Sequence, residues 1–216
     1  MPLNLTLDIL KKEASVFAIE ESAHYEPTLF GVTDGKAIGT YLEHKFQQYL
    51  IEKYFYIYGS SAKGIDFPEL GVDLKTTSKK QPQSSCPFRS AWQKVYGLGY
   101  HLLVFVYEKT DDQTLQTGRL NILHSIFVDS SKTADYQTTT GLLKIIENKG
   151  NVDDVVAFFS ERMLPLDDIQ AQELAEKVLS QPPDIGYLTI SNALQWRLQY
   201  SRVIQQAGII SGIDKL

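Results

Sequence analysis

A turn followed by a strand is expected in Gly64-Ile65-Asp66-Phe67-Pro68-Glu69-Leu70-Gly71-Val72-Asp73-Leu74-Lys75-Thr76-Thr77. The second half of this stretch alternates apolar and polar residues of types that favour strands. Alternation places Asp73 and Lys75 on one side of the strand and Leu74 on the other, where the core can lie. Asp66 precedes a Pro-Glu-Leu-Gly turn, which we expect to fold its carboxylate back beside Asp73.

These residue types suit metal-assisted hydrolysis of a phosphodiester. Two carboxylates held together, from Asp66 and Asp73, are suitable ligands for Mg²⁺, which keeps several waters and also takes phosphate oxygens. A neighbouring lysine, Lys75, can hold or polarise a water for attack on phosphorus. The alternative is that Asp73 and Lys75 form a solvated ion pair with little energetic value.

The rest of the chain predicts an α/β protein with a helical C-terminal third. We expect helices in the first third, a central sheet in the middle third and helices again at the end. We find no clear linker and expect a single nuclease domain over 1–216, with a helical part (1–58), a catalytic sheet (59–130) and a second helical part (131–216). Expected helices cover 3–22, 36–56, 90–98, 139–149, 153–163, 168–180 and 191–207, and expected strands cover 71–77, 101–107 and 119–128.

Composition narrows the class of protein. The 216 residues include one cysteine, Cys86, which excludes an internal disulfide framework and a cysteine-based zinc site. No apolar run has the length of a membrane span, and the first residues do not resemble a secretory signal. A glycine-rich loop of the nucleotide-binding type is not found, so ATP is not expected as a partner. The sequence therefore predicts a cytoplasmic protein without a membrane partner.

Charge is unevenly distributed along the chain. The net charge is −5, but no Asp or Glu lies between Lys75 and Tyr107. A polyanion would meet this local basic stretch rather than the whole surface. Candidate contacts to DNA phosphates are Lys79, Lys80, Arg89 and Lys94, with Trp92 and Tyr96 between them. Candidates for reading base edges are Gln83, Ser84, Ser85 and Arg89; a solvated loop and a core-packed helix are the alternatives for this stretch. A helix expected over 195–202 has an Arg/Gln face that could face DNA; the alternative is a core-packed Trp with solvated arginines.

The stretch from Asp66 to Thr76 resembles the active-site signature of the PD-(D/E)xK nuclease superfamily. It is similar to the DFxxLGxELKT form of the mismatch-repair nicking endonuclease MutH and its restriction-enzyme relatives, including the seven-residue spacing of the two acids. That branch has an earlier Gly-x-x-x-Glu on a helix, which Gly39 and Glu43 match here. Glu52 is a competing choice for the helix carboxylate. The branch usually has Glu where this chain has Asp73.

The resemblance implies a restriction-endonuclease-like core, a mixed central sheet flanked by helices, and a role for each matched residue. Asp66 and Asp73 would bind Mg²⁺ with the backbone carbonyl of Leu74. Lys75 would orient the attacking water and stabilise charge on the phosphate. Glu43 would lie behind them, holding a second metal or the lysine. The products would carry 5′-phosphate and 3′-hydroxyl ends.

Three functions are consistent with these residues. The first is a type II restriction endonuclease of a bacterial cytoplasm, which cuts double-stranded DNA and works as a homodimer if each chain carries one site. The second is a MutH-like nickase of mismatch repair. The third is a DNA-binding module that keeps the nuclease fold without catalysis.

Overall fold

The computed structural model describes residues 3–57, 59, 64–85, 90–191 and 197–216, and it divides into two compact units. The first unit contains residues 1–84, 101–128 and 204–216; the second contains residues 85–100 and 129–203. Each unit is assembled from separate stretches of chain, so the boundary between them is not marked by one linker in the sequence. The expectation of one domain over the whole chain stays a prediction.

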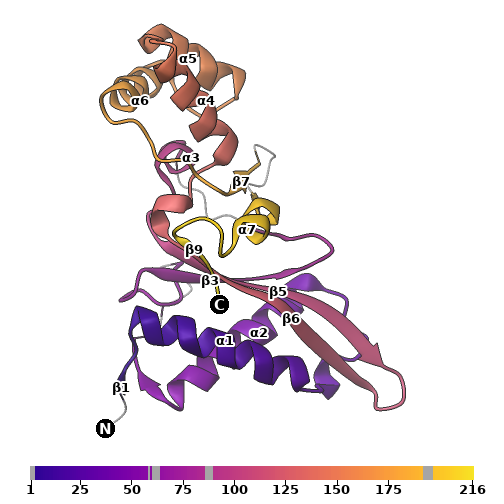
Figure 1. Ribbon diagram of the computed structural model, residues 1–216. Helices are drawn as coiled ribbons and strands as arrows, with labels where there is room; N and C mark the ends of the chain where they lie inside the picture. Colours follow the sequence, from indigo (N-terminus) through magenta and orange to yellow (C-terminus); the bar gives the residue numbers. More distant parts are fainter. Residues whose placement is uncertain (1–2, 58, 60–63, 86–89, 192–196) are drawn as a thin grey trace. The chain divides into compact units, whose positions relative to one another are not determined.

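A mixed four-stranded sheet forms the centre of the first unit (Figure 1). Its strands follow the order β3-β5-β6-β9, so β3 lies at one end of this order. β3 is parallel to β5, whereas β5 and β6, and β6 and β9, are antiparallel. The bounds are β3 Val72–Ser78, β5 His101–Asp112, β6 Thr117–Val128 and β9 Ile213–Lys215. The three expected strands are confirmed, and β5 continues five residues beyond its apolar run.

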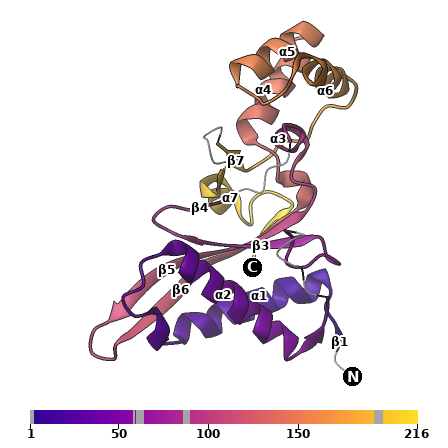
Figure 2. The ribbon, with the colours of Figure 1, turned by 180° about the vertical axis from the view of Figure 1, so that it is seen from behind.

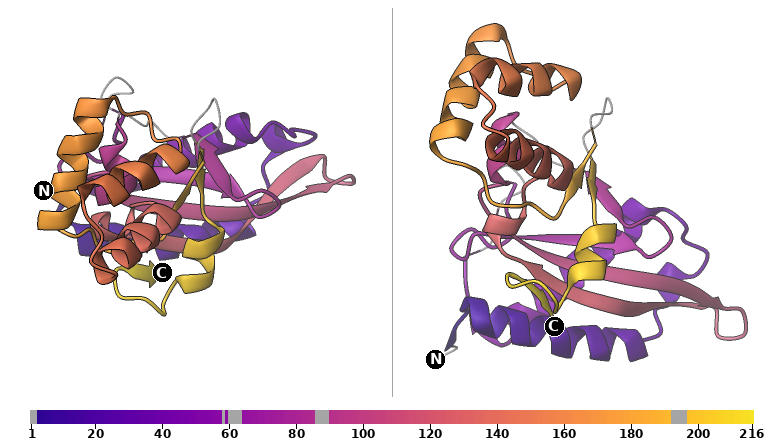
Figure 3. Two further views of the ribbon diagram at one scale, coloured as in Figure 1. Left: turned by 90° about the horizontal axis from the view of Figure 1, so that it is seen from above. Right: turned by 45° about the horizontal axis from the view of Figure 1, so that its top comes forward.

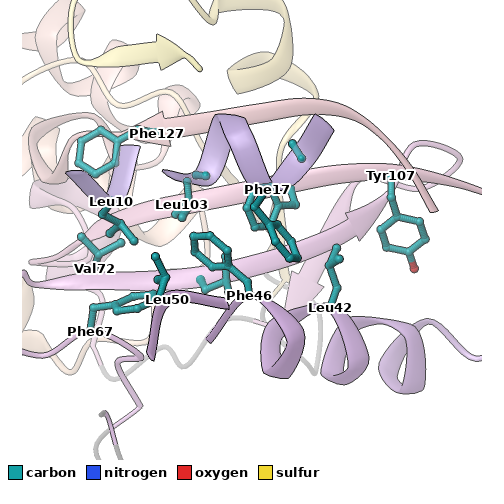
Figure 4. Packing of buried hydrophobic residues seen from close by; sticks show 14 of the residues in the cluster. Leu10, Phe17, Leu42, Phe46, Leu50, Phe67, Val72, Leu103, Tyr107 and Phe127 are labelled. Atoms are coloured by element: carbon teal, nitrogen blue, oxygen red, sulfur yellow. The ribbon is translucent and has the colours of Figure 1, made fainter. Parts of the chain in front are cut away.

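Two long helices, α1 (Leu7–Ala23) and α2 (Gly35–Ile51), cover one face of this sheet (Figure 2). Their buried faces meet the strands in a core rich in aromatic rings, which Figure 4 shows at close range. The Phe46 ring lies 4.9 Å from that of Phe17 and 5.2 Å from that of Phe105. Burial of such large apolar side chains is the main stabilising contribution in this unit.

The second expected helix ends earlier than its sequence pattern indicated. It stops at Ile51, and Tyr54–Phe55 form the short strand β2, which pairs in parallel with β1 (Leu3–Asn4). Aromatic residues favour strands, and a partner strand was present, so pairing replaced the last expected turn of helix. A short 3-10 helix, η1 (Pro27–Leu29), lies between α1 and α2 in the chain.

The second unit is mainly helical, and its helices bury a separate apolar cluster that includes Val95, Leu142, Phe159 and Leu174. Figure 3 shows α4, α5 and α6 beside one another. Asn151 and Asp167 begin α5 and α6 with capping boxes, which explains why these helix starts were predictable. The helices are α3 Trp92–Tyr96, η2 Ser130–Lys132, α4 Tyr136–Glu147, α5 Val152–Glu161 and α6 Asp168–Ser180.

The expected helix over 191–207 is confirmed only for Ser201–Gln206 and is wrong for Arg197–Gln199. Residues Arg197–Gln199 form the strand β8, which pairs antiparallel with β7 (Thr189–Ile190). Helix α7 begins only at Ser201 and ends at Gln206. Strand pairing with β7 gave these residues backbone partners that an isolated sequence pattern does not reveal. Residues 192–196 lie outside the described residues.

One further strand, β4 (Gln83–Ser85), lies within the segment expected to be a polar loop. It spans the point where the chain passes from the first unit to the second. Among the helices that the structure describes, none is both long and apolar enough to cross a membrane.

Candidate active site

A tight turn folds the chain back on itself just before β3. Phe67 and Val72 exchange backbone hydrogen bonds, with N···O distances of 2.9 and 3.2 Å, and the Leu70 N–H donates to the Phe67 carbonyl at 3.1 Å. Gly71 has a φ of 60°, a conformation that glycine adopts without the steric cost of a side chain. The turn therefore reverses the chain and returns Asp66 to the side of β3, as the sequence predicted.

The Asp66 carboxylate binds the backbone of β3. Its Oδ2 accepts a hydrogen bond of 2.8 Å from the Leu74 N–H, and its Oδ1 accepts one of 3.4 Å from Gln47 Nε2. The N–H and C=O of one strand residue point to the same side of the strand, so the Leu74 carbonyl is directed to this same edge. One carboxylate and one backbone carbonyl thus lie along the same edge of β3.

Asp73 and Lys75 lie on one side of β3. Lys75 Nζ is 2.7 Å from Asp73 Oδ2, and Asp73 is 2% exposed. This contact is an ion pair, and by strict hydrogen-bond geometry Oδ2 has no partner among the described residues. Burial raises the pKa of Asp73 to about 7, with Lys75 opposing this shift and Asp66 adding to it.

Helix α2 brings a third carboxylate, Glu43, to the same place. Burial and then the negative charge of Asp66 raise the Glu43 pKa to about 7, while the positive charge of Lys75 acts in the opposite direction. Gly39, one turn earlier, permits a close approach of α2 to β3: a Cβ at this glycine would lie only 2.8 Å from the Thr76 hydroxyl oxygen. In the Gly-x-x-x-Glu pattern, the glycine therefore lets the helix approach the strand, and the glutamate one turn later brings its carboxylate to the site.

The competing carboxylate, Glu52, lies elsewhere. It caps the C-terminal end of α2, is exposed, and accepts a hydrogen bond of 3.2 Å from Gln48 Nε2. The structure thus groups Glu43, and not Glu52, with the residues around β3.

Gln47 is a site residue that the sequence analysis missed. It lies one helical turn after Glu43, and its amide contacts Asp66. The spacing of four residues from Glu43 was the available signal, because residues at i and i+4 share one face of a helix. The Tyr56 hydroxyl donates to the Gln47 carbonyl at 3.1 Å, which ties this turn of α2 to the chain after β2.

The residues expected to contact DNA differ in their exposure. Lys79 and Lys80 are exposed just after β3, and Lys79 Nζ lies 3.8 Å from Glu108 in a weak, solvated pair. Lys94 is only 3% exposed, and burial lowers its pKa, so its ammonium group does not reach the surface for a phosphate contact. Arg89 lies outside the described residues, and Gln83, Ser84 and Ser85 form β4.

The candidate site therefore consists of three carboxylates and one ammonium group around the edge of β3. An excess of acidic groups in a largely buried place, with two of their pKa values raised, favours the binding of a cation. Lys75 adds a positive group beside that place, and a phosphate that approached the cation would meet both. This combination can bind and polarise a phosphodiester.

A family model and a sequence relative indicate the same class of protein. The family model described as "Type II restriction enzyme NspV" matches residues 4–215. The "Type II restriction enzyme NspV" of Nostoc sp. (strain ATCC 29411 / PCC 7524) is 58% identical over 209 residues, which are 97% of this chain and 95% of that protein. The crystal structure of tetrameric restriction endonuclease SfiI bound to cognate DNA is similar with 13% identity and a TM-score of 0.40, covering 100% of this chain and 88% of that one.

Proposed function

This chain belongs to the family of the type II restriction enzyme NspV, and we propose that Asp66, Asp73 and Lys75 are the catalytic residues with which it cuts DNA. It is a sequence-specific restriction endonuclease, a hydrolase of DNA. The observation that carries the residue assignment is the turn that returns Asp66 to β3, where its carboxylate holds the Leu74 N–H at 2.8 Å beside the Asp73–Lys75 pair.

We propose Mg²⁺ as the metal, held by Asp66, Asp73 and the Leu74 carbonyl. The buried Asp73 Oδ2 supports this, because it has no hydrogen-bond partner among the described residues and its close contact is the Lys75 ammonium group, itself a cation. No three His, Cys, Asp or Glu side chains form a metal-binding group among the residues that the structure describes. Mg²⁺ suits a site with so few side-chain ligands, because it retains waters and takes phosphate oxygens. When bound, it would supply Lewis-acid activation of the phosphate.

The remaining groups would act on the water and the phosphate. The Lys75 ammonium would orient a water for attack on phosphorus and would offset the negative charge that develops there. The water oxygen forms a bond to phosphorus and gives up a proton to solvent as the P–O3′ bond breaks, and O3′ takes up a proton from solvent to leave as a 3′-hydroxyl. Glu43 would hold Lys75 in place or bind a second metal. The exposed Lys79 and Lys80 would contact neighbouring phosphates, which fixes position rather than sequence.

We propose that two copies act together in the cytoplasm on double-stranded DNA. One site per chain can cut one strand, so the cleavage of both strands at a palindrome requires two chains related by two-fold symmetry. Sedimentation of the protein with a cognate duplex would test this. A complex that contains one chain per duplex would contradict it.

The catalytic assignment is tested by digestion of supercoiled plasmid with and without Mg²⁺. We expect discrete linear fragments from the unaltered protein with Mg²⁺, no cleavage in EDTA, and loss of cleavage in Lys75→Ala. Lys144→Ala, which removes an exposed lysine of α4, is the matched control and should cut normally. Open circles as the only product would indicate a nickase, and DNA binding without cleavage would indicate a non-catalytic module. Undiminished cleavage by Lys75→Ala would refute the assignment.

A further inference from the structure

β7 and β8 are neighbours in a three-stranded sheet of order β4-β8-β7, and the residues of β8 were expected to be helical. In β7 and β8, Thr189 lies opposite Gln199 and Ile190 lies opposite Leu198. The pairing continues by one residue, because the Ser191 N–H donates to the Arg197 carbonyl at 3.1 Å. Figure 3 shows the two strands side by side. The strand geometry therefore fixes which of these side chains share a face.

One face of this strand pair is buried and the other is polar. Leu198 and Ile190 are 0% and 3% exposed and pack into the interior. Side chains alternate along a strand, so Arg197 and Gln199 project from the opposite face, together with Thr189, the cross-strand neighbour of Gln199. All three are partly exposed. A helix would have separated Arg197 and Gln199 by about 200° around its axis, whereas the strand places them side by side.

The charged and amide groups of this face have no side-chain partners within the part of the chain that the structure describes. Neither the Arg197 guanidinium nor the Gln199 amide makes a hydrogen bond or ion pair with any residue in the described part of the chain. Arg202, the other arginine nearby, differs: its guanidinium carbon lies 3.6 Å from the centre of the Tyr136 ring, so its role is in packing. No Asp or Glu occurs between Asp184 and Asp214, although acids outnumber bases 26 to 21 in the whole chain. The segment that carries this face therefore contributes no negative charge of its own that would repel DNA.

We propose that this face of the β7–β8 pair lies in the major groove of the target duplex, where Arg197 reads a guanine and Gln199 reads an adenine. The major groove is wide enough for a β-ribbon, and it presents a distinct pattern of donors and acceptors for each base pair. Arginine donates two hydrogen bonds to O6 and N7 of guanine, and glutamine bonds to N6 and N7 of adenine. A sequence-specific endonuclease needs such contacts, because phosphate contacts carry no sequence information.

The test measures cleavage rates on a panel of duplexes after the recognition sequence has been mapped with the unaltered protein. Each duplex of the panel has one base pair of the site replaced. Arg197→Ala and Gln199→Ala are compared with Arg162→Ala, which removes an exposed arginine at the end of α5 in the same unit. Because the rates are compared between duplexes with the wild-type active site intact, the result does not depend on which residues hold the metal.

We expect Arg197→Ala to cut the cognate duplex roughly 10- to 100-fold more slowly and to lose discrimination at one G·C pair. Gln199→Ala should lose discrimination at one A·T pair. Arg162→Ala should keep the discrimination of the unaltered protein at every position. An equal loss on all duplexes by Arg197→Ala would identify a phosphate contact and overturn the proposal, as would unchanged discrimination.

A second variant covers the case in which Arg197→Ala does not fold. Arg197→Lys keeps the positive charge but lacks the planar pair of donors that matches guanine. We expect Arg197→Lys to bind non-specific DNA as the unaltered protein does and still to lose discrimination at the same G·C pair. Full retention of that discrimination by the lysine variant would show that charge alone is needed, and the proposed reading of guanine would be wrong.

Discussion

Two groups of carboxylates in the first unit have pKa values shifted in opposite directions. In the active-site group, burial raises the pKa values of Glu43 and Asp73 to about 7. In the second group, on α1 and before η1, burial acts in the same direction, but hydrogen bonds outweigh it. Donors from Thr28 and His24 lower the pKa of Glu26 to about 2, and donors from Tyr49, Tyr54 and Lys53 lower that of Glu13.

The difference lies in the supply of donors. Glu13 is 8% exposed, yet its two oxygens accept three hydrogen bonds, from Tyr49 at 2.6 Å, Tyr54 at 2.9 Å and Lys53 at 3.1 Å. Asp73 is more deeply buried and has an oxygen with no hydrogen bond. A carboxylate with its donors in place stabilises the fold, whereas one without them is available to a cation at a cost in stability.

The largest expected effect is the loss of cleavage in Asp73→Asn. This variant also separates activity from stability. Loss of a metal ligand should reduce cleavage by about 10³-fold or more, since a bound metal contributes several kcal/mol to transition-state stabilisation. In EDTA, the variant should melt at the same temperature as the unaltered protein or higher, because burial raises the pKa of Asp73 to about 7 despite the ion pair with Lys75, so the ionised carboxylate costs stability at neutral pH. Plasmid cleavage and calorimetry measure the two quantities.

Asp184→Asn, at an exposed position, is the control and should change neither quantity. A fall of several degrees in the melting temperature of Asp73→Asn would show that this carboxylate stabilises the fold as Glu13 does. The two groups of carboxylates would then not differ in their effect on stability.

The second prediction concerns Glu26→Gln, which should show the reverse behaviour. The Glu26 carboxylate accepts hydrogen bonds from the Thr28 hydroxyl at 2.7 Å and from the Thr28 N–H and His24 at 3.1 Å. We expect its replacement to lower the free energy of unfolding by about 2 kcal/mol, after allowance for its partial exposure, and to leave cleavage unchanged. Urea titration measures the loss, and Glu20→Gln, on the exposed side of α1, is the control. Equal stability of the two variants would contradict the prediction.

A third prediction uses the metal itself. Mg²⁺ at tenfold its Kd should stabilise the unaltered protein by about 1.4 kcal/mol, because it binds the folded state only. Asp66→Asn should lose this stabilisation but keep its fold, since the asparagine oxygen can still accept from the Leu74 N–H. Glu26→Gln should keep the full effect of Mg²⁺. Melting curves at constant ionic strength provide the measurement, and equal stabilisation of Asp66→Asn would exclude Asp66 as a ligand.

Much of the fold was predictable because local patterns and tertiary pairing agreed. The apolar run after His101 could only be a buried strand, and the capping residues of α5 and α6 marked those helices. The failures were at β2 and β8, where residues that matched a helical pattern found partner strands. The division into two units was also not visible, because each unit is built from stretches far apart in the sequence.

The site was predictable where its residues are close in sequence. Asp66, Asp73 and Lys75 are joined by one turn and one strand, so their grouping follows from local geometry. The choice between Glu43 and Glu52 required the position of α2 against β3, which depends on Gly39 and its close approach to Thr76. Periodicity shows which residues share a face of a helix, but not how far along the strand that helix lies.

The smallest expected effect is the pH dependence of the stability that Glu26 contributes. Its pKa is about 2 in the folded protein and 4.5 for a free glutamate, so its stabilising contribution is present above pH 4.5 and is lost as the pH falls towards 2. The difference in unfolding free energy between the unaltered protein and Glu26→Gln should therefore be constant near pH 6 and should fall by about 1 kcal/mol at pH 3. Paired urea titrations at pH 6, 4.5 and 3 measure it. A difference that grew on acidification would mean that the hydrogen bonds favour the protonated carboxyl, and Glu26 would then belong with the carboxylates of the active site.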